Sequence, residues 1–127
     1  MNHGVLDTSA VLAWLRDEPG ADMVDPLLDG SVMGAANWSG LAQTLLQHGA
    51  DARQTTARLV ALGLTVEAFT DADALRAAEL WPVTRSAGLS LGDRACLALA
   101  ARLELPAVTA DQAWSNLDLP ATVQTIR

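Results

Sequence analysis

The chain has 127 residues, of which 50% are apolar, and its 15 acidic and 8 basic side chains give a formal net charge of −7. This length and apolar content suit one domain, residues 1–127, with a substantial core. Every basic residue other than histidine is arginine, and the acidic balance disfavours nucleic-acid binding through a broad basic surface. If the substrate is a polyanion, a divalent cation is one way to supply positive charge locally.

Targeting signals and disulfides are not expected. No apolar run approaches the roughly 20 residues that a membrane-spanning helix needs. The N-terminal sequence lacks the basic segment and apolar stretch of a signal peptide. The single cysteine, Cys96, excludes an internal disulfide and a metal site built from several cysteines. We therefore expect a cytoplasmic protein that does not enter a membrane.

Short β-like runs alternate with helical stretches along the chain. In the first half we expect a strand at 3–6, a helix at 9–16, a break at 17–20, a short helix to residue 28, a strand at 31–35 and helices at about 38–48 and 51–62. In the second half we expect a strand at 64–69, a helix at 71–81, a helix at 90–103, a strand at 106–110, a helical turn from residue 111 and a strand at 121–126. This alternation predicts a three-layer α/β/α sandwich around a parallel sheet of about five strands.

Three aspartates occupy special places in this pattern. Asp7 follows the first strand, Asp111 follows the strand at 106–110, and Asp93 stands at the start of the helix at 90–103. Ligands of an open parallel sheet bind outside the carboxyl ends of its strands, so these side chains are expected to meet at one edge. Clustered carboxylates repel one another unless a cation lies between them, and oxygen ligands suit Mg²⁺ or Mn²⁺.

A structural interpretation remains open for each of these acids. Asp7 and Asp111 can cap the helical segments that follow them. Ser90 and Asp93 have the spacing of a capping box. Each aspartate taken alone is thus explained by helix capping, and only the three together favour a metal site.

The segment "NWSGLAQTLLQHG" (37–49) contains an unusual glycine. Asn37 and Ser39 are suitable cap residues for the helix expected from about residue 38. Gly40 then lies in or near the first turn, although glycine inside a helix costs about 1 kcal/mol relative to alanine. Close helix packing is one explanation for this glycine.

The segments "VLDTSAVLAWL", "AANWSGLAQTL" and "LSLGDRACLALAARLELPAVTAD" resemble the PIN-domain family and, more narrowly, the VapC-type ribonuclease toxins of bacterial type II toxin–antitoxin pairs. The resemblance covers nearly the whole chain. It implies a five-stranded parallel sheet, a Mg²⁺ or Mn²⁺ site built from acids, endoribonuclease activity on RNA, a homodimer and a cognate antitoxin protein that blocks the site.

The family's site residues can be placed on this sequence one by one. The resemblance implies that Asp7, Asp93 and Asp111 are the catalytic and metal-binding acids. Their polar neighbours in the motifs are Thr8, Ser9, Asn37 and Thr109. Arg94, beside Asp93, is either a contact to an RNA phosphate or a solvated helix residue. Trp14 lies on the first helix, where VapC-type proteins dock their antitoxin, although packing within the monomer would also explain it.

One family acid is missing. The family carries a glutamate on the helix after the second strand, in a pattern like Asn-Leu-Ala-Glu, and this sequence reads Asn37-Trp38-Ser39-Gly40. Gly40 therefore stands at a vacated acidic position, and reduced nuclease activity is expected. The alternative is a catalytically dead PIN-fold protein that acts only as a binding partner of the antitoxin or of RNA.

Two other classes of α/β protein are excluded by missing residues. A receiver domain needs an acidic pair after its first strand and a lysine late in the chain, and this chain contains no lysine. A nucleotide-binding module needs a glycine-rich phosphate loop, and neither G-x-x-x-x-G-K-[ST] nor G-x-G-x-x-G occurs.

Overall fold

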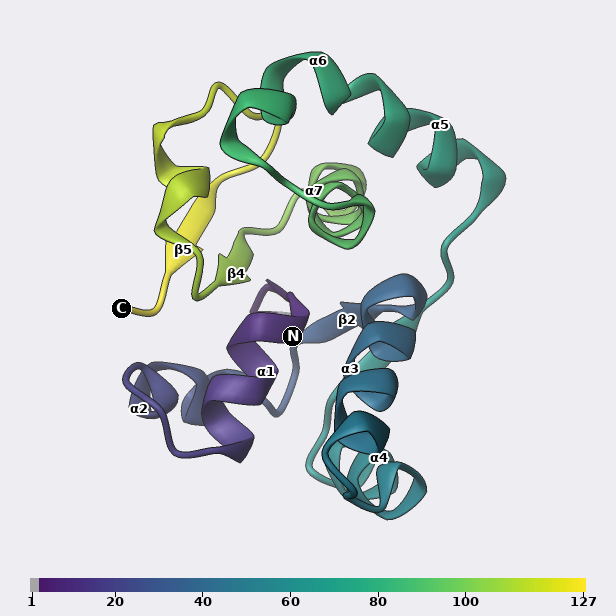
Figure 1. Cartoon of the computed structure of the whole chain (residues 1–127), viewed down its shortest axis with the longest axis vertical. Helices are drawn as coiled ribbons and strands as arrows, with labels where there is room; N and C mark the ends of the chain where they lie inside the picture. The colour runs from purple at the N-terminus through teal and green to yellow at the C-terminus, as the bar shows by residue number, and fades with distance from the viewer. Residues whose placement is uncertain (1–2) are drawn as a thin grey trace.

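The computed structural model describes residues 3–127 and is built around a five-stranded parallel sheet in the order β3-β2-β1-β4-β5 (Figure 1). The strands are β1 (Val5–Leu6), β2 (Val32–Gly34), β3 (Thr65–Glu67), β4 (Ala107–Thr109) and β5 (Val123–Thr125). The central strand is β1, whose Val5 lies opposite Val32 of β2 and Ala107 of β4. The predicted α/β/α class with about five parallel strands is confirmed.

The helices follow the predicted order closely. The α-helices are α1 (Thr8–Leu15), α2 (Ala21–Val24), α3 (Ala35–Gln47), α4 (Ala52–Ala61), α5 (Asp71–Glu79), α6 (Trp81–Thr84) and α7 (Leu91–Leu103). The 3₁₀ helices are η1 (Asp25–Leu27), η2 (Arg85–Ala87) and η3 (Gln112–Asn116). The prediction missed α6 and η2, where Pro82 lies in the first turn of α6, a position that tolerates proline. None of the helices in residues 3–127 has the length and apolar character needed to cross a membrane.

The start of α3 differs from the prediction. The helix begins at Ala35 instead of about residue 38, and its N-cap, Gly34, makes no side-chain cap hydrogen bond. The prediction that Asn37 caps this helix is therefore wrong, because Asn37 is the third helical residue and is buried. Gly40 consequently lies in the second turn of α3, where glycine costs about 1 kcal/mol relative to alanine.

The two faces of the sheet carry separate cores, because successive strand residues point to opposite sides. Leu6, Met33 and Val108 belong to one core together with residues of α1, α3 and α4. Val5, Val32 and Ala107 belong to the other core together with apolar residues of α7. In Figure 1, α7 is seen end-on, with α5 and α6 curving around its outer side. The central strand is therefore covered on both faces.

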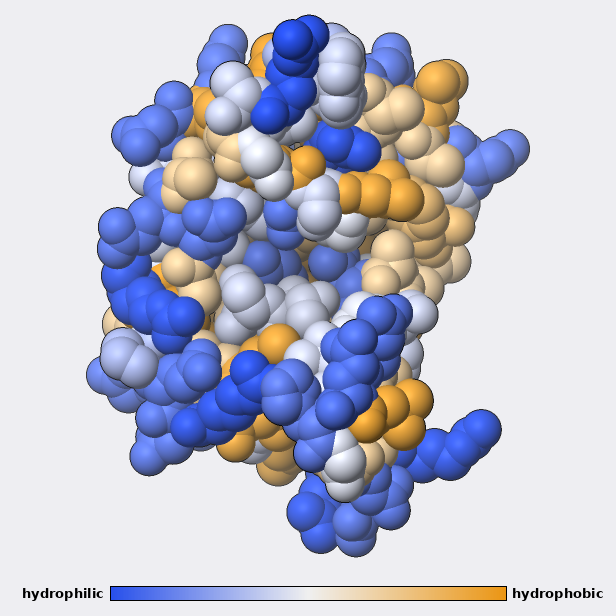
Figure 2. All heavy atoms as spheres, in the orientation of Figure 1, coloured by the Kyte–Doolittle hydropathy of each residue, from blue (hydrophilic) through white to orange (hydrophobic). Residues whose placement is uncertain are grey.

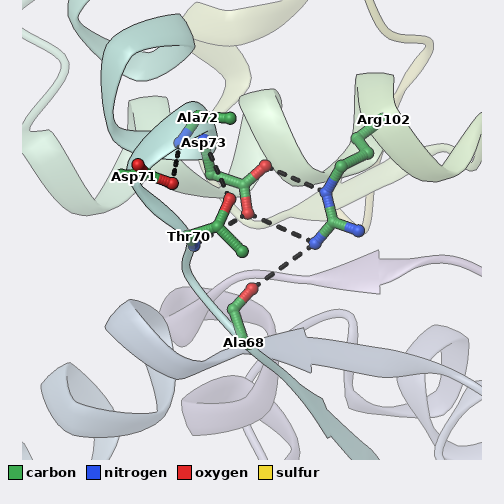
Figure 3. Close-up of polar contacts among 6 residues, drawn as sticks. All are labelled: Ala68, Thr70, Asp71, Ala72, Asp73 and Arg102. Carbon is green, nitrogen blue, oxygen red and sulfur yellow. Dashed lines mark hydrogen bonds and ion pairs between the residues drawn. The ribbon is translucent and has the colours of Figure 1, made fainter.

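A salt bridge joins α5 to α7 (Figure 3). The Nε and Nη2 atoms of Arg102 lie 2.9 and 3.2 Å from the two carboxylate oxygens of Asp73, and Nη2 also donates to the Ala68 carbonyl at 3.4 Å. Asp73 is fully buried and forms a capping box with Thr70 at the start of α5. Burial raises the pKa of Asp73, but the hydrogen bonds from Thr70 and Arg102 outweigh it, so this pKa lies below its ordinary value.

Removing the guanidinium group should destabilise the fold in a pH-dependent way. In Arg102→Met the aliphatic stem remains, while the buried carboxylate of Asp73 loses its charged partner, at a cost of about 2 kcal/mol in the free energy of unfolding at pH 7. Because the pKa of Asp73 is lowered, its carboxylate stabilises the folded state at pH values above the ordinary pKa of aspartate. The difference in stability between the wild type and Arg102→Met should therefore shrink below about pH 4. Urea denaturation measures it.

Arg16→Met is the matched control, because Arg16 is exposed and forms no ion pair with the described residues. Equal losses of stability in the two variants would contradict the role given to the salt bridge.

Candidate functional site

Asp7 lies at the carboxyl end of the central strand and is only 3% exposed. One of its carboxylate oxygens accepts hydrogen bonds from the Ala10 backbone N–H at 2.9 Å and from the Ser9 hydroxyl at 2.7 Å. The other oxygen accepts a 2.7 Å hydrogen bond from the hydroxyl of Thr109 on β4. Asp7 is thus the N-cap of α1 and also joins the ends of two neighbouring strands.

The two hydroxyl groups around Asp7 are themselves held in place. The backbone N–H of Ala110 donates to the Ser9 hydroxyl at 3.0 Å, and that of Asp111 donates to the Thr109 hydroxyl at 3.0 Å. The two hydroxyl oxygens are 3.3 Å apart. The structure therefore brings Ser9 and Thr109 to the carboxylate of Asp7, as the motif suggested, and fixes its orientation.

The pKa of Asp7 is raised from an ordinary value of 3.8 to about 6. Burial is the largest cause, and the negative charge of Asp93 adds to it, against the lowering effect of the hydrogen bonds. The same two carboxylates, after burial, raise the pKa of the Cys96 thiol in α7. Asp7 and Asp93 therefore act on the same small region between β1 and the first turns of α7.

Asp93 and Ser90 form a capping box at the start of α7. The Ser90 backbone N–H donates to the Asp93 carboxylate at 2.8 Å, and the Asp93 backbone N–H donates to the Ser90 hydroxyl at 3.2 Å. The side chain of Asp93 is only partly buried. The capping interpretation of this acid is confirmed, and one of its carboxylate oxygens has no hydrogen-bond partner among residues 3–127.

Asp111 does not complete a three-acid cluster. It is exposed, and its carboxylate accepts a 3.0 Å hydrogen bond from the Ala113 backbone N–H as the N-cap of η3. Across the described residues 3–127, no three His, Cys, Asp or Glu side chains are grouped closely enough to hold a metal ion. The expected cluster of Asp7, Asp93 and Asp111 is thus not assembled in the described residues, and each of the three carboxylates takes part in capping a helix.

The remaining donors nevertheless fit a hard divalent cation. Asp7 and Asp93 offer oxygen ligands only, and such hard ligands suit Mg²⁺ or Mn²⁺. Mg²⁺ is commonly held by one or two carboxylates and several waters, so two acids are sufficient in principle. Figure 2 shows a hollow near the centre of this face, with hydrophilic residues inside it, between α1 and α7 of Figure 1.

Gly40 faces this region. A Cβ atom at position 40 would lie 3.5 Å from the hydroxyl oxygen of Thr8 and would meet no other atom within 4 Å outside its own helix and its chain neighbours. Thr8 follows Asp7 directly and begins α1. A longer side chain at position 40 therefore has room to extend beside the start of α1, so close helix packing does not explain the glycine.

Arg94 and Asn37 are both engaged with neighbouring backbone. One guanidinium nitrogen of Arg94 donates to the Leu89 carbonyl at 3.4 Å, and its buried Nε has no hydrogen-bond partner within residues 3–127. Asn37 donates to the Gly92 carbonyl at 3.1 Å. Sequence reasoning missed this contact to α7, because a backbone carbonyl gives no signal in the sequence.

The larger grooves lie away from these acids. Two grooves share Trp14: one of about 340 Å³ also contains Asp17, Asp22 and Asp25, and one of about 310 Å³ between α1 and α4 also contains Leu59 and Leu62. The Trp14 indole N–H donates to Asp25 at 2.9 Å. A third groove, of about 460 Å³, lies between α3 and α4 beside Trp38.

The comparisons with known proteins agree with this geometry. A family model described as PIN domain matches residues 4–119. The chain is similar to a toxin–antitoxin complex from Klebsiella pneumoniae, at 15% identity and a TM-score of 0.75 over 98% of each chain. It is also similar to VapBC2 from Rickettsia felis bound to a promoter DNA fragment, at 14% identity and a TM-score of 0.69 over 98% of each chain.

A third similar structure is FitAcB from Neisseria gonorrhoeae, at 19% identity and a TM-score of 0.64 over 99% of this chain and 98% of that one. At these identities the solved structures support the fold alone. No curated protein matches the sequence.

Removing the charge of Asp7 should remove the loss of stability that this carboxylate causes as the pH rises. A pKa raised from 3.8 to about 6 means that the Asp7 carboxyl binds its proton more tightly in the folded state than in the unfolded state. The stabilisation that this proton gives the folded state is complete below pH 3.8 and is lost as the pH rises through about 6. The loss corresponds to about 3 kcal/mol above that range. Asp7→Asn has no carboxyl group to titrate, so it does not show this loss. The free energy of unfolding of the variant minus that of the wild type should therefore rise by about 3 kcal/mol between pH 4 and pH 8.

Urea denaturation at several pH values measures this difference. A relative stability that does not change with pH would show that the Asp7 carboxylate is not destabilised by its surroundings.

Proposed function

This chain belongs to the PIN domain family, and on that premise we propose that it is a Mg²⁺- or Mn²⁺-dependent endoribonuclease, the toxin of a VapBC-type toxin–antitoxin pair, with activity impaired at Gly40. PIN domains are generally nucleases, which are hydrolases. The observation that carries the proposal is the pair of carboxylates formed by Asp7, at the carboxyl end of the central strand, and Asp93, in the first turn of α7, whose charge helps to raise the pKa of Asp7. A bound cation would also offset the electrostatic repulsion between this acidic protein, with its net charge of −7, and the phosphates of an RNA substrate.

In this proposal, Asp7 and Asp93 hold the divalent ion. Ser9 and Thr109 keep the Asp7 carboxylate in one orientation through 2.7 Å hydrogen bonds. Asp111, exposed on the adjoining turn, is not grouped with the other two acids and would contact the ion only through water. When bound, the metal ion supplies an activated water and stabilises negative charge on the phosphodiester. Arg94 is the proposed contact to an RNA phosphate.

The vacated position limits this chemistry. A glutamate at position 40 would extend from α3 past the Thr8 hydroxyl, toward the start of α1. With glycine there, the site has one carboxylate fewer to bind the cation and to orient water. Loss of one positioned catalytic group commonly costs on the order of 10²–10⁴ in rate.

The proposed partner is a cognate antitoxin that docks on α1. The two grooves that share Trp14 place an apolar surface between α1 and α4 next to an acidic pocket. Leu62 is 48% exposed at this surface, which leaves apolar area available for a partner. We further propose a homodimer that acts in the cytoplasm.

A second function is supported by two observations. Gly40 removes a carboxylate, and residues 3–127 contain no group of three potential metal ligands. Both favour a catalytically dead PIN-fold protein that serves only as a binding partner of the antitoxin or of RNA. Metal binding and RNA cleavage distinguish the two functions.

The first test concerns the metal. Mn²⁺ at ten times its Kd should stabilise the wild-type protein by about 1.4 kcal/mol, because it binds the folded state only. Asp93→Asn should abolish most of this effect, whereas Glu79→Gln, which changes an exposed acid at the end of α5 outside the site, should leave it intact. Thermal melts with and without Mn²⁺ measure the shift in Tm. A shift that survives in Asp93→Asn would limit Asp93 to its capping role.

The second test restores the missing acid. Gly40→Glu should raise Mn²⁺-dependent RNA cleavage by at least about 10²-fold. Gly40→Gln is the matched control, because glutamine has nearly the same size and helix propensity but no charge. Cleavage of a labelled RNA at one Mn²⁺ concentration compares the three proteins. Equal rates for the glutamate and glutamine variants would show that position 40 is not the vacated acidic position.

A further inference from the structure

Asn37 connects the three helices that surround the candidate site. Its side-chain Nδ2 donates to the backbone carbonyl of Gly92, in the first turn of α7, at 3.1 Å. Its own backbone carbonyl accepts a 3.1 Å hydrogen bond from the hydroxyl of Thr8, the first residue of α1. One buried residue of α3 therefore contacts the residue after Asp7 and the residue before Asp93.

The side chain of Asn37 is only half satisfied. It is 4% exposed, and its Oδ1 atom is buried without a hydrogen-bond partner among the described residues. A buried acceptor without a partner costs about 1–3 kcal/mol. An apolar side chain of similar size would avoid this cost. What a leucine at this position would lose is the hydrogen bond from Nδ2 to the Gly92 carbonyl in α7.

The contact to Gly92 acts directly on the placement of Asp93. The carboxylate of Asp93 is held by the first turn of α7 through Ser90, so any shift of that turn moves it. The hydroxyl of Thr8 donates to the Asn37 carbonyl at 3.1 Å and would lie 3.5 Å from a Cβ atom at position 40. Asn37 thus fixes α3 against both helices whose first residues adjoin the acids.

We propose that Asn37 is a positioning residue that sets the location of Asp93 relative to Asp7 and thereby the metal affinity of the pair. The proposal rests on the proposed function, since it assigns Asn37 a role in that site. Residues that orient metal ligands typically change metal affinity by 10–100-fold when they are replaced.

The first experiment tests the contact without metal. In Asn37→Leu, amide hydrogen exchange should become faster at Asp93 and Arg94, whose N–H groups donate to Ser90 in the first turn of α7. Exchange at Glu104, at the other end of α7, should stay unchanged. Asn37→Ala gives the same comparison if the leucine variant does not fold. Unchanged exchange at Asp93 and Arg94 would overturn the proposal.

The second experiment measures Mn²⁺ affinity by calorimetry in the wild type and in the Gly40→Glu background. Asn37→Leu should weaken binding by about 10-fold or more. Leu59→Ala is the stability control, because Leu59 is buried on α4 in the core and should destabilise the fold while leaving Mn²⁺ affinity unchanged. Equal losses of affinity in the two variants, or no loss in Asn37→Leu, would overturn the positioning role.

The two readouts separate this inference from the proposed function. If neither the wild type nor Gly40→Glu binds Mn²⁺, the metal-dependent function fails and the positioning role fails with it. Faster exchange at Asp93 would then still show that Asn37 holds the first turn of α7. If Mn²⁺ binds but is insensitive to Asn37, only the positioning role is contradicted.

Discussion

The buried carboxylate of Asp7 is the constraint on which the rest of the site depends. It terminates the central strand, where burial and the charge of Asp93 raise its pKa to about 6 despite three hydrogen bonds. Such a group is a liability for stability unless a cation or a proton neutralises it. The neighbouring hydroxyl groups orient the carboxylate without removing its charge, and in the proposed function a divalent cation neutralises it.

Much of the fold could be predicted from the sequence because the strand and helix signals along the chain occur in the order that a parallel α/β sheet requires. Short apolar runs alternate with helical segments, which specifies a parallel sheet covered on both faces. The predicted capping box of Ser90 and Asp93 and the caps at Asp7 and Asp111 are all present. The location of the acids at strand and helix ends was therefore readable from their positions alone.

The remaining features depend on contacts between segments distant in sequence. Asn37 has the chemistry of a cap residue, but α3 starts earlier and the side chain instead donates to Gly92, 55 residues away. Asp73 was not singled out from the sequence, because its ion pair with Arg102 requires the packing of α5 against α7. The three acids all cap helices as expected but are not grouped closely enough to form a cluster, because their separation in space depends on how η3 and α7 pack, which spacing along the chain does not reveal.

The central claim is that Asp7 and Asp93 together hold a divalent cation. Anomalous diffraction from crystals of the wild-type protein soaked in Mn²⁺ tests it most directly, since it locates the ion without relying on cleavage. The account predicts one strong peak within about 2.0–2.3 Å of a carboxylate oxygen of each aspartate, the distance range of oxygen ligands to small divalent cations. A peak only elsewhere, or none when Mn²⁺ is saturating, would contradict it.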